Sequence, residues 1–282
     1  MDRVALPDGR AMSFHSWGPT DGPLLIHFHG VPGSRLELAP AAAALGAGGV
    51  RVVAPDRPGI GHSDPAPGRG MVDCAADAIA LADRLGVERF AVSGFSAGGP
   101  YALALAASYP DRVTAVLLMS SAGDPSTPDV DRGVVASERL LSRLAQRKPA
   151  VARALWRGTR TVLRHRPALV TGSLLSTAPA DAAWFDAEKA RQVSETLLES
   201  LRQGTDAMVE DYGRCYDLWD FDPRAVRAPV TAWHGEVDQL VPMRLAEHLQ
   251  AELPDATLHR LPGTGHIGTL RITADVLAAV PR

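Results

Sequence analysis

The 282-residue chain contains little cysteine, little lysine and no long apolar run. Its two cysteines, Cys74 and Cys215, are too few for a disulfide framework and have no metal-ligand spacing, so we expect ordinary reduced thiols and no metal site. Lysine occurs only at positions 148 and 189 while arginine is abundant, a bias that reflects genome composition rather than function. The most apolar stretch, residues 39–50, is short and interrupted by glycines, which excludes it as a membrane span.

A strong charge of one sign is also missing. The formal net charge is −3 without a dominant basic tract, so nucleic acid is not expected as a partner, and a small-molecule substrate is. The first ten residues, MDRVALPDGR, hold no apolar run of signal-peptide length, and a cytoplasmic location is expected. A chain that is 46% hydrophobic and 22% charged buries a sizeable core, which excludes disorder. Whether the protein forms a homo-oligomer stays open.

Short apolar runs alternate with helical patterns along most of the chain. Asp8 and Gly9 lie between two short alternating segments and predict an opening β-hairpin. Strands buried on both faces are expected within residues 23–30, 50–59, 89–96, 113–123, 229–236 and 256–263. Residues 71–86 predict a helix whose apolar face holds Val72, Ala76, Ile79 and Leu85 and whose opposite face holds Asp73, Asp77 and Arg84. This alternation predicts an α/β fold with a mostly parallel central sheet flanked by helices.

One long interval contains no strand pattern. Residues 124–228 carry only helical patterns, and a segment of this length is too long for a structureless loop. We therefore expect a core formed by residues 1–123 and 229–282, with residues 124–228 inserted as a helical cap. Because the insertion leaves the sheet between two core strands, it is expected to cover one end of that sheet.

A G-x-S-x-G motif lies where a strand pattern meets a helix pattern. Gly94 and Gly98 flank Ser96 at two residues on either side, and a serine held on a tight strand-to-helix turn needs such small neighbours. The turn exposes the Ser96 hydroxyl above the sheet. The backbone N–H of Ala97, at the positive end of the following helix, then faces any oxyanion that forms.

Three further segments supply the partners that such a serine requires. The turn after residues 23–30 exposes the N–H of Val31 as a second oxyanion donor, and His29 beside it is interpreted as structural. Asp238 follows a strand end, and His266 lies in a glycine-flanked turn after the last strand. A serine hydroxyl is a weak nucleophile, so a histidine must accept its proton and a carboxylate must support that histidine.

With these residues in place, the sequence resembles the α/β-hydrolase family over nearly the whole core. The resemblance is carried by five motifs: HGVPGS (29–34), DRPGIGHSD (56–64), GFSAGG (94–99), HGEVDQLVP (234–242) and GTGHIG (263–268). It implies a catalytic triad of Ser96, Asp238 and His266, with Val31 and Ala97 donating to the oxyanion. It also implies a helical cap at the strand-free interval, and a hydrolase that needs no cofactor and no metal.

Several alternatives remain at this stage. Asp124 follows the strand at 113–123 and rivals Asp238 as the acid, although the latter occupies the position where this fold usually supports its histidine. A serine esterase acting on a small, largely apolar substrate is the leading hypothesis. A carbon–carbon bond hydrolase, a cofactor-free perhydrolase or haloperoxidase, and a receptor-like protein with little turnover are the others. Relatives that open epoxides or remove halide carry Asp at the elbow, so Ser96 argues against both reactions.

The insertion adds two features whose role the sequence leaves open. Arginines recur at helical spacing, and we interpret them as solvated or paired with the acids that follow (Arg139, Arg143, Arg147, Arg153, Arg157, Arg160 and Arg164). Trp156, Trp184 and Trp219 lie in or beside the expected cap, and some of them should line an apolar pocket.

Overall fold

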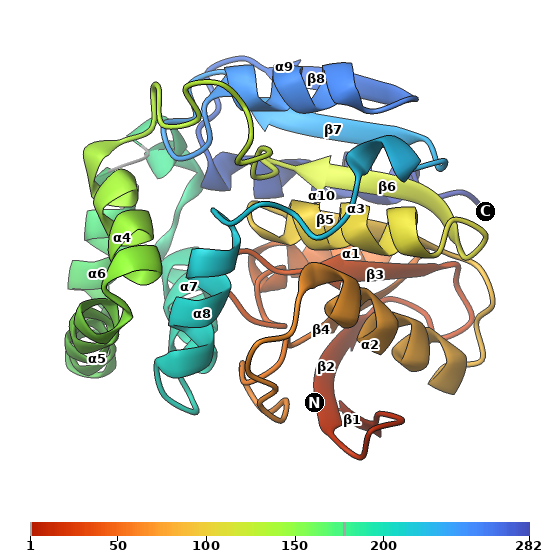
Figure 1. Ribbon diagram of the computed structural model, residues 1–282, viewed down its shortest axis with the longest axis horizontal. Coiled ribbons are helices and arrows are strands. Elements are labelled where there is room, and N and C mark those ends of the chain that lie inside the picture. Colours follow the sequence, from red (N-terminus) through yellow and green to blue (C-terminus); the bar gives the residue numbers. More distant parts are fainter. Residues whose placement is uncertain (1, 177–178) are drawn as a thin grey trace.

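The computed structural model describes residues 2–176 and 179–282, except for the side chains of residues 173–176. Its centre is an eight-stranded sheet of order β1-β2-β4-β3-β5-β6-β7-β8 (Figure 1). The strands are β1 (Asp2–Ala5), β2 (Ala11–Trp17), β3 (Leu24–Phe28), β4 (Arg51–Pro55), β5 (Phe90–Phe95), β6 (Val113–Met119), β7 (Val230–Gly235) and β8 (Ala256–Leu261). β1 and β2 form the antiparallel hairpin expected around Gly9, and β3 to β8 pair in parallel.

The predicted fold class is confirmed. Each of the six expected strands forms inside its predicted range, and the sheet is antiparallel only where β2 joins β1 and β4. Neighbouring residues of a strand face opposite layers, because side chains alternate along it: Ile26 and Val92 belong to one buried cluster, while Leu25 and Ala91 belong to the other. Burial on both faces explains why these runs are continuously apolar.

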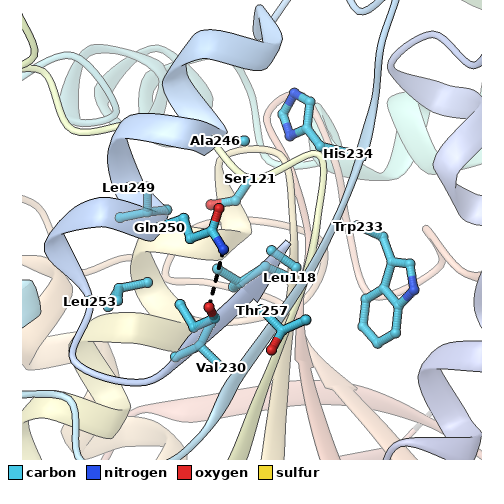
Figure 2. Close-up of a pocket in the computed structure, with 12 residues that line it drawn as sticks. Leu118, Ser121, Val230, Trp233, His234, Ala246, Leu249, Gln250, Leu253 and Thr257 are labelled. Atoms are coloured by element: carbon cyan, nitrogen blue, oxygen red, sulfur yellow. Dashed lines mark hydrogen bonds between the residues drawn. The ribbon is translucent and has the colours of Figure 1, made fainter. Parts of the chain in front are cut away.

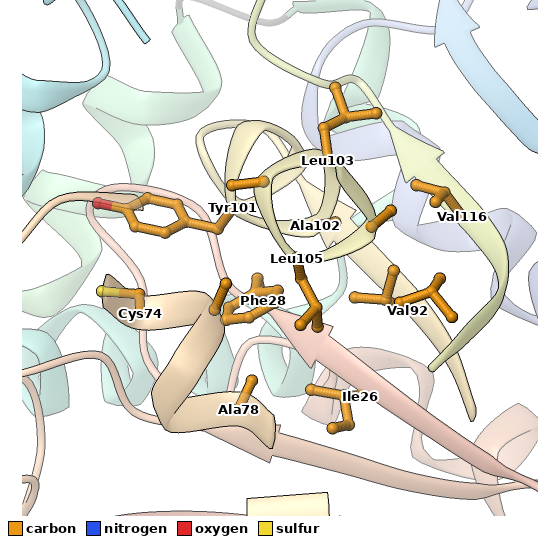
Figure 3. Close-up of a cluster of buried hydrophobic side chains, with 14 of the residues drawn as sticks. Ile26, Phe28, Cys74, Ala78, Val92, Tyr101, Ala102, Leu103, Leu105 and Val116 are labelled. Atoms are coloured by element: carbon orange, nitrogen blue, oxygen red, sulfur yellow. The ribbon is translucent and has the colours of Figure 1, made fainter. Parts of the chain in front are cut away.

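Helices cover both faces of the sheet. On one face lie α2 (Met71–Arg84), α3 (Gly98–Ser108) and α9 (Met243–Glu252), and on the other lie α1 (Ala42–Ala47) and α10 (Thr273–Ala278). Figure 3 shows the first of these layers, in which Leu105 of α3 and Ala78 of α2 approach Ile26 and Val92 of the sheet. Cys74 lies in the same layer, where burial raises the pKa of its thiol to about 12. Both cysteines are free and buried.

Helix α2 forms where expected, but its buried face differs from the prediction. Met71, Cys74, Ala78 and Leu81 face the core, among others, whereas Val72 is only partly buried. The reason is Asp77, which is buried because it pairs with Arg10 at 2.7 Å and with Arg69 at 2.8 Å. A paired acid can therefore occupy a helix face that simple hydropathy assigns to solvent.

The interval between β6 and β7 is helical, and no strand occurs in its described part. Its elements are α4 (Ala136–Arg147), α5 (Pro149–His165), α6 (Pro167–Ser176), η2 (Pro179–Trp184), α7 (Ala187–Ser200), α8 (Asp206–Arg214) and η3 (Pro223–Ala225). Figure 1 shows α4 to α8 grouped at one end of the molecule, beyond the arrowheads of β6 and β7. Helices α4 to α8 pack mainly on one another. We call residues 124–228 the insertion.

Buried ion pairs join the insertion to the rest of the chain. Arg35, which follows β3, bonds Asp56 and Glu199 of α7 at 2.6 Å each. Desolvation opposes the charge of Arg35, but the two carboxylates hold its pKa above the ordinary value. In the same way Arg57 contacts Asp211 of α8 at 2.7 Å. No helix in the described part of the chain is long and apolar enough to cross a membrane.

Candidate active site

The nucleophile turn has the backbone geometry that the motif predicts. Ser96 lies between β5 and α3 with φ of +53°, a left-handed conformation that is rare for residues other than glycine. The two flanking glycines allow it, because a Cβ on Gly94 would lie 2.3 Å from the carbonyl oxygen of Gly98. A Cβ on Gly98 would lie 2.0 Å from the carbonyl oxygen of Phe28. Strain of this kind persists where the surrounding backbone fixes it, and is often found at functional sites.

Three predicted residues from distant parts of the sequence are joined in a continuous series of hydrogen bonds. His266 Nε2 lies 2.9 Å from Ser96 Oγ, and His266 Nδ1 lies 2.7 Å from Asp238 Oδ2. The other oxygen of Asp238 accepts the backbone N–H groups of Leu240 and Val241, both at 2.9 Å. Both carboxylate oxygens are therefore bonded, which fixes the orientation of the acid toward the imidazole.

The electrostatic surroundings of His266 make its imidazole more basic. Burial alone would lower the pKa of His266, but the negative charge of Asp238 and its hydrogen bond raise the pKa above the ordinary 6.5. Burial alone would raise the pKa of Asp238, yet its contact with His266 holds that pKa below the ordinary 3.8. Asp238 therefore stays ionised near neutral pH and stabilises an imidazolium next to Ser96.

The rival acid and the flanking histidine occupy other positions. Asp124 accepts the backbone N–H of Ser126 at 2.7 Å and closes its own turn, so it is Asp238 that bonds His266. His29 is fully buried, its Nδ1 lies 2.8 Å from the carbonyl oxygen of Gly30, and burial holds its pKa well below 6.5. A neutral histidine bonded to backbone in this way holds the turn after β3.

The two expected oxyanion donors border the same space as the serine. Val31 and Ala97 both line the cavity that contains Ser96. Within the described part of the chain, no protein acceptor is bonded to the N–H of either residue. Glu37 holds the turn after β3 in place. Its carboxylate accepts the N–H of Gly30 at 2.8 Å and contacts His27 at 3.1 Å. Two unbonded N–H groups beside a nucleophile are what an oxyanion requires.

The serine and histidine open into a large, mainly apolar cavity of about 570 Å³. The core contributes the turn after β3, residues around Ser96 and residues beside Asp238 and His266, and helices α4 to α8 contribute a large part of the remaining wall. A volume in this range suits a drug-sized ligand. Among the described residues, no three His, Cys, Asp or Glu side chains are grouped as a metal site would require.

A second void lies away from this chemistry, between β6, β7 and α9 (Figure 2). Its volume is about 10 Å³, and it is lined by side chains such as Leu118, Leu249 and Leu253. Gln250 closes one side by donating to the carbonyl oxygen of Ala256 at 3.2 Å. A space that holds at most one water is a packing gap and not a ligand site.

One residue at the site was missed by the sequence reasoning. Asp181 of η2 is buried, and its carboxylate accepts the N–H of Gly265 at 2.7 Å and the N–H of Ile267 at 2.9 Å. The insertion thus bonds the backbone on both sides of His266. No motif surrounds Asp181, and only the fold brings it within reach of a loop more than eighty residues away. The sequence around Asp181 therefore offers no local signal that marks this acid.

The tryptophans and arginines of the insertion divide between different roles. Trp156 lines the cavity, whereas Trp184 packs against Phe185 beside the α1 and α10 layer, and Trp219 stacks on Phe221 against the other layer. Arg143 pairs with Asp131 at 2.8 Å and Arg153 pairs with Asp206, as the paired interpretation expects. The remaining arginines of the stripes form no ion pair with the described residues (Arg139, Arg147, Arg157, Arg160 and Arg164).

Comparison with known proteins agrees with this architecture. The sequence model described as "alpha/beta hydrolase fold" matches residues 23–270. A 2-hydroxymuconate semialdehyde hydrolase of Pseudomonas putida is 28% identical, covering 94% of this chain and 87% of the relative. A bifunctional esterase/perhydrolase of Acinetobacter calcoaceticus is 26% identical, covering 94% and 93%.

Solved structures give the same result for the fold. A thermophilic esterase from Thermogutta terrifontis superposes with a TM-score of 0.72 at 21% identity, covering 99% of this chain and 96% of that one. The family match extends over far more than half of the sequence, and the two relatives above are named as hydrolases. The chain belongs to the α/β-hydrolase fold family.

Proposed function

We propose that the protein is a serine esterase that hydrolyses small, largely apolar carboxylic esters through an acyl-enzyme on Ser96. One observation carries this proposal: the bonded chain of Ser96, His266 and Asp238 opens onto an apolar cavity of about 570 Å³. The nucleophile and its base are within hydrogen-bond reach, the base is oriented by a carboxylate, and a substrate-sized space adjoins them.

The reaction follows from the roles of these groups. His266 takes the proton of the Ser96 hydroxyl as the oxygen attacks the ester carbonyl, and the N–H groups of Val31 and Ala97 stabilise the oxyanion. His266 then returns the proton to the departing alcohol, which leaves an ester bond to Ser96. A water molecule activated by the same histidine hydrolyses that bond. Asp238 keeps the imidazole oriented and balances its transient positive charge.

The charges around the cavity argue against an anionic substrate. No lysine or arginine lines the cavity in the described part of the chain, and the undescribed side chains of residues 173–178 include neither residue type. The relative from Pseudomonas putida is named for a muconate semialdehyde, which bears a carboxylate. A carboxylate buried in this cavity would have no cationic side chain to pair with, at a high desolvation cost. The lining of the cavity therefore favours an ester without a carboxylate group over a substrate that carries one.

Two measurements test the proposal. A fluorophosphonate probe should label the native protein on Ser96 and fail to label the Ser96→Ala variant. A series of p-nitrophenyl esters from acetate to decanoate should be hydrolysed, with a burst of p-nitrophenol if deacylation is slow. Labelling without turnover on any ester would instead indicate a receptor-like protein, and absence of both would remove the esterase assignment.

A further inference from the structure

One wall of the cavity differs chemically from the rest. Glu138 of α4 lines the cavity, and its carboxylate accepts a hydrogen bond from the hydroxyl of Tyr216 at 2.5 Å. Burial and then the negative charge of Glu138 raise the pKa of Tyr216 and of Tyr212. Both phenols therefore stay protonated at neutral pH, and the Tyr216 hydroxyl remains a donor to the carboxylate.

Aromatic rings adjoin this carboxylate. Tyr216 stacks on Tyr212 with ring centroids 6.2 Å apart. The ring centroid of Trp156 in α5 lies 6.3 Å from that of Tyr212. All three side chains line the same cavity as Ser96 and Glu138. A row of aromatic rings next to a carboxylate presents negative potential from both the ring faces and the acid.

Besides a contribution to the raised pKa of His266, the described contacts of Glu138 do not account for its charge. Glu37 also lines the cavity, but its two oxygens are bonded to Gly30 and His27 and hold the oxyanion turn. A hydrogen bond between α4 and the segment after α8 does not itself require an acid, because a glutamine oxygen would accept the same hydroxyl. Glu138 is only partly buried, but its carboxylate faces a mainly apolar cavity, where a bound cation would be attracted to it.

We propose that Glu138 and the rings of Trp156, Tyr212 and Tyr216 form a subsite for a protonated or quaternary ammonium group of the ester substrate. The proposal rests on the esterase function above and specifies its preferred substrates, small esters that also carry an ammonium group. Cation–π attraction and the carboxylate charge act together on such a group, while a carboxylate in the same position is repelled. Neutral esters remain substrates, bound by the apolar walls alone.

A pair of isosteric esters measures this selectivity directly. The ester butyrylcholine (choline butyrate) and its carbon analogue 3,3-dimethylbutyl butyrate have the same shape, but only the first carries a positive charge. We expect a higher kcat/KM for the choline ester, and we expect Glu138→Gln to lower the ratio of the two values about tenfold. Glu195→Gln is the matched control, because Glu195 is an exposed acid of α7 paired with Arg191, and it should leave the ratio unaltered.

Tyr216→Phe distinguishes a subsite from a structural tie. This substitution removes the hydrogen bond between Tyr216 and Glu138 but keeps the charge of Glu138. If the subsite exists, the preference for choline butyrate should therefore persist. A tie between helices predicts that Tyr216→Phe and Glu138→Gln reduce the hydrolysis of both esters equally, at an unaltered ratio. That result would overturn the subsite, as would equal kcat/KM values for the two esters in the native enzyme.

Binding without turnover separates this proposal from the esterase function. Phenyltrimethylammonium should bind the Ser96→Ala variant in calorimetry, and the added Glu138→Gln substitution should weaken its affinity about tenfold. If no ester is hydrolysed while this binding is observed, the esterase assignment fails and the subsite stands. If neutral esters are hydrolysed and no ammonium compound binds, the subsite fails and the esterase assignment stands.

Discussion

The core and the insertion differ in how completely their apolar side chains are buried. In the core, strand residues such as Ile26, Val92 and Val116 are completely buried between sheet and helices. In the insertion, several large apolar side chains are substantially exposed, and three of them also line the cavity (Leu155, Val162 and Leu169). Apolar surface that faces a substrate space must stay uncovered until substrate binds. In the proposed esterase, the core holds the reacting groups and the insertion supplies surface for recognition.

The contacts between these two regions include several that are polar and buried. Arg35 connects Asp56 to Glu199, Arg57 connects the loop after β4 to Asp211, and Asp181 reaches the loop of His266. Buried pairs add little net stability because of desolvation, but removing one partner is costly, so they fix one geometry. The difference between the regions is therefore testable: core substitutions should remove the chemistry, and substitutions in the insertion should change its selectivity or alignment.

The largest effect is expected for Ser96→Ala. Loss of the nucleophile should lower kcat for p-nitrophenyl acetate on the order of 10⁵-fold or more, because the acyl-enzyme cannot form. Alanine carries the same Cβ as serine at φ of +53°, so the thermal midpoint should move little. Parallel measurement of kcat and of thermal unfolding checks both parts. Retained hydrolysis with intact folding would contradict the assignment of the nucleophile.

The next effect separates two acids of the core. Asp238→Asn should lower kcat on the order of 10³-fold, since an amide neither charges nor orients His266 as the carboxylate does. Asp124→Asn should change kcat little, because Asp124 only closes its own turn. Steady-state kinetics of the two variants compare them directly. A larger loss for Asp124→Asn would show that the acid acts from the loop after β6.

Asp181 lies on the contact between the regions, so its substitution should affect both stability and rate. Asp181→Ala leaves the buried N–H groups of Gly265 and Ile267 without an acceptor, and we expect a loss of about 2–4 kcal/mol in the free energy of unfolding. A displaced His266 loop should also lower kcat on the order of tenfold to 10²-fold with little change in KM. Chemical denaturation and kinetics measure the two effects. Asp181→Asn keeps one acceptor oxygen and should be intermediate. Normal kcat in a destabilised Asp181→Ala variant would limit this residue to a structural role.

Asp181 also shows where sequence reasoning ends. The strands, the elbow at Ser96 and the positions of Asp238 and His266 were predictable, because each depends on local pattern: continuous apolar runs, flanking glycines and strand-end loops. The fold then brings these positions together. The contact of Asp181 with the His266 loop depends on how the insertion packs on the core, and no local pattern encodes that packing.

The walls of the cavity were only partly predictable for the same reason. The sequence indicated that some of Trp156, Trp184 and Trp219 should line a pocket, without indicating which. Trp156 lines the cavity, while Trp184 fills space beside Phe185. Trp156 lies in α5 and Trp184 in η2, and which of the two lines the cavity depends on how these helices pack on the core. The charge of Glu138 in the cavity was likewise hidden, because its partner Tyr216 is 78 residues away.

The pH dependence of the reaction reports on the contact between His266 and Asp238. The base must be neutral, so kcat/KM should fall as pH drops through the pKa of His266, about tenfold per unit below it. Because Asp238 raises that pKa above 6.5, the midpoint should lie above 6.5. In Asp238→Asn the midpoint should move to lower pH, measurable on the residual activity. A midpoint below 6.5 in the native enzyme, or an upward shift in the variant, would contradict this electrostatic account.

The smallest effect is expected inside the insertion, where Trp156→Ala should change chain-length preference while the chemistry persists. Trp156 lines the cavity next to Tyr212, so its removal lengthens the space for an acyl chain. The kcat/KM ratio of p-nitrophenyl decanoate to acetate should rise about tenfold, as expected when pocket space for a few methylenes is gained.

Trp219→Ala is the matched control for this last comparison, because Trp219 stacks on Phe221 at 5.0 Å and packs against a core layer away from the cavity. Both substitutions delete a large apolar side chain and should cost stability, so stability alone cannot account for a change confined to one of them. If Trp219→Ala shifts chain-length preference as much as Trp156→Ala, selectivity does not arise from the wall of the insertion. If only Trp156→Ala shifts it, the division between a core that reacts and an insertion that selects is upheld by two residues of the same type.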